Sequence, residues 1–251
     1  MTTLKALTDI AKSYGCSSLI GTQNAKTVKG EKLDYLTGIL YMMPDDVICP
    51  VARLAGCRSA CLVSAGRAAF TPGIGMARAA RTQFFHADRD NFMKLLFKEV
   101  KKVVDKASKT GVHSAIRLNG TSDVDWSNIP VEGFNNIFEA FPDTQFYDYT
   151  KSPSIVRKAA SIKNWDITAS YSGASDKYSS MIVKAAMQYN TNLAVVFDSK
   201  KLPKTFLDRP VISGDETDLR FMDEKGVIVG LYAKGAAKKD TTGFVIATDK
   251  A

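Results

Sequence analysis

Histidine, tryptophan and cysteine are scarce in this chain, and it has no long hydrophobic run. The 251 residues include two histidines, two tryptophans and four cysteines. No apolar run approaches the roughly 20 residues of a membrane-spanning helix, and the N-terminus lacks an apolar core with a cleavage site. We therefore expect neither a membrane span nor a signal peptide. In the reducing compartment that this implies, grouped cysteines indicate ligands or catalysts rather than disulfides.

Several catalytic signatures are also missing. No serine lies in a nucleophile elbow, and the Gly-Ile-Gly at 73–75 lacks the rest of a phosphate-binding glycine loop. Basic and aromatic residues do not alternate as in an RNA-binding motif. The commonest sequence motifs of hydrolases, nucleotide-binding proteins and RNA-binding proteins are therefore not found in this chain.

Positive charge is in excess and is unevenly distributed. The net charge is +8, and the segment 44–93 contains six of the ten arginines and no lysine. Arginine suits bidentate contact with carboxylate or phosphate, so the segment favours an anion pocket. Ordinary surface arginines paired with neighbouring acids explain the same pattern equally well.

Three cysteines within thirteen residues dominate the sequence. If the segment is helical, the spacing of Cys57 and Cys61 places both thiols on one face. Cys49 approaches from the preceding loop, with Pro50 after it, and Gly56 allows the chain to turn. Three interpretations remain open: a [4Fe–4S] cluster with one open iron, a zinc site completed by His86 or a carboxylate, or small buried side chains without a ligand.

Strand and helix patterns alternate along most of the chain. We predict strands at 36–43, 114–120, 144–150, 165–172, 192–198, 209–215, 226–233 and 243–248. We predict helices at 3–14, 60–82 with a break at 71–75, 88–109, 134–141, 153–161 and 176–189. This alternation predicts a single α/β domain over 1–251 with an N-terminal helical extension. Its expected form is a partial or irregular (β/α) barrel of mainly parallel strands, with an open doubly wound sheet as the alternative.

Polar residues gather where these predicted strands end, which is where α/β proteins bind ligands. We expect Arg117 to hold a carboxylate, while other strand-end groups offer hydrogen bonds or flat surfaces to a small ligand. The candidate binding residues are Arg117, Asn119, Asp123, Tyr147, Asp148 and Asp215. Ordinary turns capped by side-chain hydrogen bonds are the competing explanation.

Several ordered segments carry a family resemblance. They are TGILYM, CPVARLAGCRSACL, SAGRA, AIRLNGTSDVDW, QFYDYTK, VISGDETDLRF and VGLYAKG. Together, over about 21–247, they resemble bacteriophage proteins and, more distantly, the phage gene product 88 family. That family has a Cys-Pro…Cys…Cys cluster, a strand ending in Ser-Gly-Asp and another ending in Tyr-Thr-Arg, which Thr121–Asp123 and Tyr149–Lys151 match here. The resemblance implies a phage origin and no particular reaction.

The plan of the chain is similar, more weakly, to that of radical S-adenosylmethionine enzymes. Those enzymes place three cysteines in a loop after the first strand of a partial barrel, usually spaced Cys-x3-Cys-x2-Cys. This chain has Cys-x7-Cys-x3-Cys. The resemblance implies that an open iron could bind S-adenosylmethionine.

The sequence thus predicts a phage iron–sulfur protein with Cys49, Cys57 and Cys61 as ligands. Its expected partner is a small anionic or amino-acid-bearing ligand, its expected location is the cytoplasm of the infected bacterial host, and whether it is an enzyme is left open. The alternative from another class is a nucleic-acid-binding or host-regulating phage protein with a structural metal site.

Overall fold

The computed structural model describes residues 2–23, 27, 30 and 32–250. The α-helices are α1 (Leu4–Ser13), α3 (Pro72–Ala87), α4 (Arg89–Thr110), α5 (Ile137–Ala140), α6 (Pro153–Ala159) and α7 (Asp176–Gln188). The strands are β1 (Ile20–Gly21), β2 (Tyr35–Leu40), β3 (His113–Arg117), β4 (Gln145–Thr150), β5 (Trp165–Ser170), β6 (Leu193–Phe197), β7 (Thr205–Phe206), β8 (Arg209–Ser213) and β9 (Ile228–Tyr232). Short 3₁₀ helices are η1 (Leu62–Ser64), η2 (Gly66–Ala69), η3 (Trp126–Asn128), η4 (Arg220–Met222), η5 (Gly235–Lys239) and η6 (Thr248–Lys250).

The strands form one mostly parallel sheet in the order β1-β2-β3-β4-β5-β6-β9-β8-β7. All neighbouring pairs from β2 to β8 are parallel, whereas β1 and β7 pair antiparallel with β2 and β8. The predicted parallel α/β sheet is therefore confirmed. In the described part of the chain the edge strands β1 and β7 do not pair with each other, so the sheet is not closed. Curvature into a partial barrel stays a prediction.

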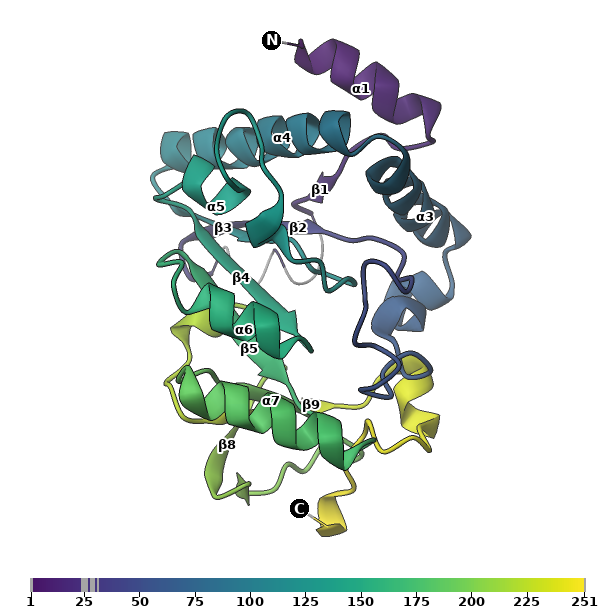
Figure 1. Ribbon diagram of the computed structural model, residues 1–251, viewed down its shortest axis with the longest axis vertical. Coiled ribbons are helices and arrows are strands. Elements are labelled where there is room, and N and C mark those ends of the chain that lie inside the picture. The colour runs from purple at the N-terminus through teal and green to yellow at the C-terminus, as the bar shows by residue number, and fades with distance from the viewer. Residues whose placement is uncertain (1, 24–26, 28–29, 31, 251) are drawn as a thin grey trace.

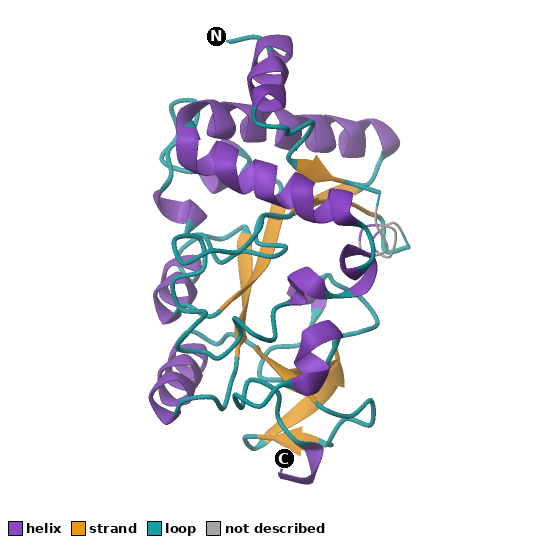
Figure 2. Ribbon diagram, turned by 90° about the vertical axis from the view of Figure 1, so that its right-hand side faces the viewer, coloured by secondary structure: helices purple, strands orange, loops and turns teal. Residues whose placement is uncertain are grey.

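The helices α4 to α7 pack on one face of the sheet, where Figures 1 and 2 show α6 and α7 side by side. Phe92, Phe138 and Ile182 from these helices meet Ile116 and Phe146 from the strands in one hydrophobic core. The opposite face carries a smaller cluster of Ala115, Tyr147 and Leu219. A doubly wound sheet has helices on both faces, whereas these four helices lie on one face.

The segment 60–82 differs from its prediction. Residues 50–60 form consecutive turns, η1 and η2 follow, and the predicted break at 71–75 is instead the start of α3. Pro72 lies in the first turn of α3, where its fixed φ angle suits a helix and its missing N–H costs nothing. The predicted strand at 243–248 is reduced to a single bridge between Ile246 and Phe197.

Candidate functional site

The first cysteine is held at the carboxyl edge of the sheet by two neighbouring loops. The carboxylate of Asp45 accepts hydrogen bonds from the backbone N–H groups of Val47 and Ile48, and the Cys49 N–H donates to the Asp45 carbonyl at 3.0 Å. The Asp123 N–H donates to the Ile48 carbonyl at 2.8 Å. The loop after β2 is thereby joined to the loop after β3.

The turn before the second cysteine docks against two further loops. Gly56 has a φ of +65°, and its carbonyl accepts a hydrogen bond from Thr242 Oγ1 at 3.1 Å. A Cβ at Gly56 would lie 2.6 Å from the Cβ of Ala174 and 2.7 Å from Thr242 Oγ1. Figure 1 shows the cysteine segment beside the yellow C-terminal segment around 235–245. A glycine is required here by conformation and by space.

The three thiols share one electrostatic environment without forming a finished metal site. Burial raises the pKa of Cys49 to about 12, and Asp123, Cys61 and Cys57 add to the shift. Burial also raises the pKa of Cys57, with Cys61 contributing to the increase. Nevertheless, no three histidine, cysteine, aspartate or glutamate side chains of the described residues are grouped closely enough to hold a metal ion.

The helical arrangement expected for Cys57 and Cys61 is wrong. Cys57 lies in the run of turns, and Cys61 has extended backbone angles, with φ −60° and ψ 136°. The stacked geometry of residues four apart on a helix is therefore not available to these thiols. Three soft sulfur donors on one segment still match the ligand chemistry of iron–sulfur clusters and zinc, but ligation would require the turns at 57–61 to rearrange.

Lys151 is a cation of this site that the sequence placed at a strand end without marking it as a binding residue. It is half-buried after β4, and its Nζ lies 3.3 Å from Ser170 Oγ and 5.5 Å from the ring centroid of Phe244. Burial alone would lower the pKa of Lys151, but attraction to Cys57 and Asp123 raises it overall. A lysine after a strand looks like a solvated surface residue in a sequence, so only the fold reveals its neighbours.

Asn119 organises the loop after β3. Its Oδ1 accepts hydrogen bonds from Ser122 Oγ, the Val124 N–H and Trp126 Nε1, and its Nδ2 donates to the Val124 carbonyl. The Asn119 N–H also donates to Asp148 Oδ1 at 2.6 Å. These contacts are those of a structural loop residue, as the competing explanation from turn chemistry anticipated.

The two buried aspartates, Asp123 and Asp148, differ in how many of their carboxylate oxygens accept a hydrogen bond. Both Asp123 oxygens are engaged, by Thr150 Oγ1 at 2.6 Å and by the Lys151 N–H at 2.9 Å. Asp148 Oδ2 has no hydrogen-bond partner among the described residues. Burial raises the pKa of Asp148 to about 7, although Arg117 and the Asn119 N–H act in the opposite direction.

Arg117 lies on the face of the sheet away from the helices, where its guanidinium group is already paired with a carboxylate of the protein. Its Nη1 donates to both carboxylate oxygens of Asp218, at 2.9 and 3.0 Å, and its guanidinium lies 4.7 Å from the ring centroid of Tyr149. Tyr147 is buried on the same face against Phe221. A ligand carboxylate at Arg117 would have to displace Asp218, a partner that the sequence did not indicate.

Asp215 is separate from these groups. It is exposed after β8 and pairs with Lys234 at 2.5 Å.

Cys16, the outlying cysteine, is buried near the end of α1, where its Sγ donates to the Ser18 carbonyl. His86 lies 2.7 Å from Asp45 and so supports the loop before Cys49. The zinc interpretation with His86 as fourth ligand would require this pair to separate.

The arginine-rich segment does not form an anion pocket in its described side chains. Arg53 and Arg58 both pair with Asp46. Arg78 donates to the Val63 carbonyl, and Arg81 donates to the carbonyls of Ser18 and Tyr41. The guanidinium of Arg89 lies 4.3 Å from the Phe85 ring centroid. Arg53 and Arg58 thus follow the surface-pairing explanation, whereas Arg78, Arg81 and Arg89 support local structure through backbone carbonyls or an aromatic ring.

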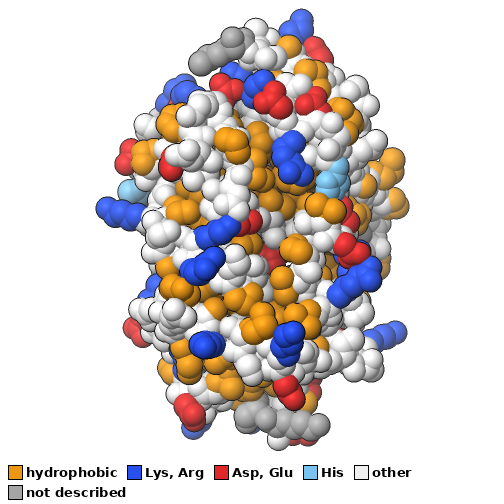
Figure 3. Space-filling view, in the orientation of Figure 1, with side chains coloured by type: hydrophobic (Ala, Val, Ile, Leu, Met, Phe, Trp, Pro, Cys, Tyr) orange, Lys and Arg blue, Asp and Glu red, His pale blue; other side chains and the backbone are white. Residues whose placement is uncertain are grey.

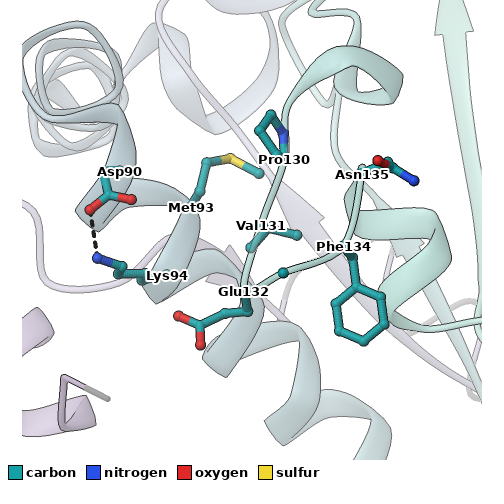
Figure 4. A pocket seen from close by; sticks show the side chains of 9 residues that line it. Asp90, Met93, Lys94, Pro130, Val131, Glu132, Phe134 and Asn135 are labelled. Carbon is teal, nitrogen blue, oxygen red and sulfur yellow. Dashed lines mark hydrogen bonds and ion pairs between the residues drawn. The ribbon is translucent and has the colours of Figure 1, made fainter.

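A cavity of about 360 Å³ lies away from the cysteines, between α4 and the turn at 130–135. Figure 4 shows Met93 and Lys94 of α4 facing Val131 and Glu132 across it, with Lys94 paired to Asp90. Because its cation is already paired and no cysteine lines it, this cavity adds no group to the candidate site.

Fold and site together define an α/β protein with a three-cysteine segment and a half-buried lysine at the carboxyl edge of a mostly parallel sheet. The family model of gene product 88 matches residues 18–248, so the chain belongs to the gene product 88 family, and the predicted resemblance to these phage proteins is confirmed. No curated protein and no solved structure matches the chain. The resemblance to radical S-adenosylmethionine enzymes stays a prediction. No helix in the described ranges is long and apolar enough to cross a membrane.

Proposed function

We propose that this phage protein binds a [4Fe–4S] cluster through Cys49, Cys57 and Cys61. The observation that carries the proposal is the shared electrostatic environment of the three thiols with Lys151 and Asp123. Three protein thiolates would leave one iron open to a further ligand. Burial raises the pKa of the Cys49 and Cys57 thiols, so binding requires the loss of their protons as well as movement of the turns at 57–61.

The ligand count, rather than the charge, separates a cluster from zinc at this site. A [4Fe–4S]²⁺ cluster with three thiolates carries a net negative charge, which the ammonium group of Lys151 would offset in a half-buried place. Zinc would need a fourth protein ligand or a water molecule, and His86 is engaged by Asp45. Zn²⁺ on three thiolates carries the same net charge, so Lys151 would offset either group, and the engagement of His86 is what disfavours zinc.

The cysteines themselves supply the test. Anaerobic reconstitution of the wild-type chain should give brown protein with about four irons and four sulfides per chain. Cys57→Ala should lose the colour and the iron. Cys16→Ala removes a buried thiol outside the site and should keep both. Colourless protein with stoichiometric zinc, or equal iron in both variants, would overturn the proposal.

For the open iron we propose an amino-acid-bearing ligand of the S-adenosylmethionine type. Its support is the plan of the chain, in which a cysteine segment follows the first parallel strand and helices cover one face of the sheet. Adding S-adenosylmethionine to the reduced, reconstituted protein should change its electron paramagnetic resonance spectrum. An unchanged spectrum would end this ligand assignment while leaving cluster binding intact.

Nucleic-acid binding is the second candidate, and its support is the net charge of +8. Binding of this kind weakens steeply with salt because counterions are released. Mobility shifts with duplex DNA and with RNA at low and moderate salt test it, and no shift at low salt would remove the candidate. The paired arginines of the segment 44–93 make it the weaker of the two.

A further inference from the structure

An open groove of about 780 Å³ lies between α7 and the turn that joins β7 to β8. Its apolar lining is formed by Tyr171, Val183, Met187 and Leu207, with Lys184 at its side. The Tyr171 ring packs edge-on against Phe206 at a centroid distance of 5.3 Å, which gives the groove a fixed floor. No cysteine lines this groove, so it is separate from the proposed metal site.

The apolar side chains at the groove are more exposed than folding requires. Met187 is 57% exposed and Leu207 is 38% exposed, and Met181 is also exposed on α7. Figure 3 shows hydrophobic side chains interspersed with basic side chains over the lower part of the molecule, where α7 lies. Exposed methionines adapt their shape easily and are common at surfaces that accept other chains.

The turn beside the groove is strained, and the strain places an apolar residue there. Leu207 and Asp208 have φ angles of +50° and +56°. Two such residues form the two-residue hairpin turn for which Asn-Gly is favoured, whereas leucine is unfavourable at positive φ. Strain of this kind tends to persist where it serves a function. Here it holds Leu207 against the groove that Met187 lines from α7.

The charge around the groove indicates which partner it suits. Lys177, Met181, Lys184 and Gln188 recur at helical spacing on the exposed side of α7. Lys204 lies at the base of the β7–β8 hairpin. None of these three lysines forms an ion pair with another described residue. The apolar floor of the groove would suit the large apolar side chains of a partner helix, and the unpaired lysines would suit its acidic side chains.

We propose that the α7–β8 groove is a docking site for an acidic amphipathic helix of another protein. The helix lays its apolar side chains against Tyr171, Met187 and Leu207, and its carboxylates face Lys184 and Lys204. The inference does not depend on cluster binding, because none of these residues contacts the cysteine segment through a described hydrogen bond or ion pair.

The probe is a fluorescein-labelled amphipathic peptide in which leucine forms one helical face and glutamate the other. Fluorescence anisotropy against the full chain should show saturable binding that weakens as salt is added. A peptide with lysine in place of glutamate should bind at least about tenfold more weakly, since like charges repel. Absence of binding, or equal binding of the two peptides, would overturn the proposal.

Variants test the location. Met187→Glu adds a charge to an exposed helical position and should weaken binding by at least about tenfold, the usual effect of losing one well-packed apolar contact. Met76→Glu is the matched control, because Met76 is also an exposed helical methionine, 72% exposed on α3. The control should bind like the wild type, and a loss as large as that of Met187→Glu would overturn the assignment.

The strained turn gives a second readout that a purely structural role would not produce. Leu207→Asn suits the left-handed backbone and should keep or raise the melting temperature while weakening peptide binding. Equal binding by Leu207→Asn would show that the strain does not serve the groove and would overturn the proposal. Circular dichroism melting curves of every variant separate a lost site from a lost fold.

Discussion

Replacing Gly56 with alanine should damage the cysteine segment more than replacing any unobstructed glycine of similar conformation. The added methyl group must adopt a φ of +65° and would lie 2.6 Å from the Ala174 Cβ. Left-handed backbone costs about 1–2 kcal/mol for a residue with a Cβ, and overpacking adds about 1–3 kcal/mol. The hydrogen bond from Thr242 to the Gly56 carbonyl, worth about 1 kcal/mol, should also weaken. We expect the free energy of unfolding to fall by about 3–5 kcal/mol.

Gly66→Ala is the matched control for this prediction. Gly66 has a φ of +62°, but a Cβ there would meet no described atom within 4 Å. It should therefore lose only the backbone cost of about 1–2 kcal/mol. Urea denaturation followed by circular dichroism measures both variants. Equal losses would refute the argument that Gly56 is needed for close approach to the 174 and 242 loops.

The two glycine variants also separate folding from metal binding. Gly56→Ala displaces the turn that carries Cys57, so it should incorporate less iron than wild type even under conditions where it remains folded. Gly66→Ala should incorporate wild-type iron. Normal iron content in a folded Gly56→Ala protein would show that the docked position of this turn is not required for ligation.

Three further predictions concern charge. Because burial raises the pKa of Cys49 to about 12, a metal ion must displace the proton of this thiol. Each unit fall in pH should therefore weaken Zn²⁺ or Co²⁺ binding by up to about tenfold per thiol. Cobalt–thiolate absorption titrations measure this affinity, and an affinity that does not change with pH would contradict the prediction. Asp218→Asn leaves the buried Arg117 without its carboxylate and should cost about 3–5 kcal/mol in urea denaturation, whereas replacing both residues with Leu and Met should recover much of the loss. Burial raises the folded-state pKa of Asp148 to about 7, above its unfolded value of about 3.9. The free energy of unfolding should therefore fall as pH rises through that range. Asp148→Asn should make urea denaturation less dependent on pH there, and an unchanged pH dependence would refute the assignment.

The sequence was a good guide to the regular elements with a long, one-sided hydrophobic pattern. Helix α4 begins after its Asp88 cap and ends before Gly111, close to the predicted 88–109. The parallel strands were also found, since their apolar runs are buried and bounded by turn residues. The short edge strands β1 and β7 were missed because two-residue strands carry no periodic signal.

Prediction of the site was less complete, for reasons that lie in tertiary contacts. Asn119 and Asp148 do lie at strand ends. The sequence could not show, however, that Asn119 organises its own loop, or that Asp148 accepts a hydrogen bond from the Asn119 N–H. Arg117 was expected to be available for a carboxylate, and its actual partner, Asp218, is 101 residues away in the chain. Such long-range pairs follow from strand order, which local patterns do not encode.

The cysteine segment depends on several strand ends at once, and this makes its geometry a consequence of the whole sheet. Ile48 is tied to the loop after β3, Gly56 contacts the loop after β5 and the C-terminal segment, and Lys151 extends from the end of β4. A slip in the register of any of these parallel strands would move one anchor relative to the others, because a one-residue shift reverses the face to which every side chain points. Metal binding should therefore stabilise the sheet as a unit rather than the segment alone. Hydrogen exchange would reveal this as increased protection of β4 and β5 amides in the iron-loaded protein, and protection confined to residues 45–62 would show that the segment binds metal independently of the sheet.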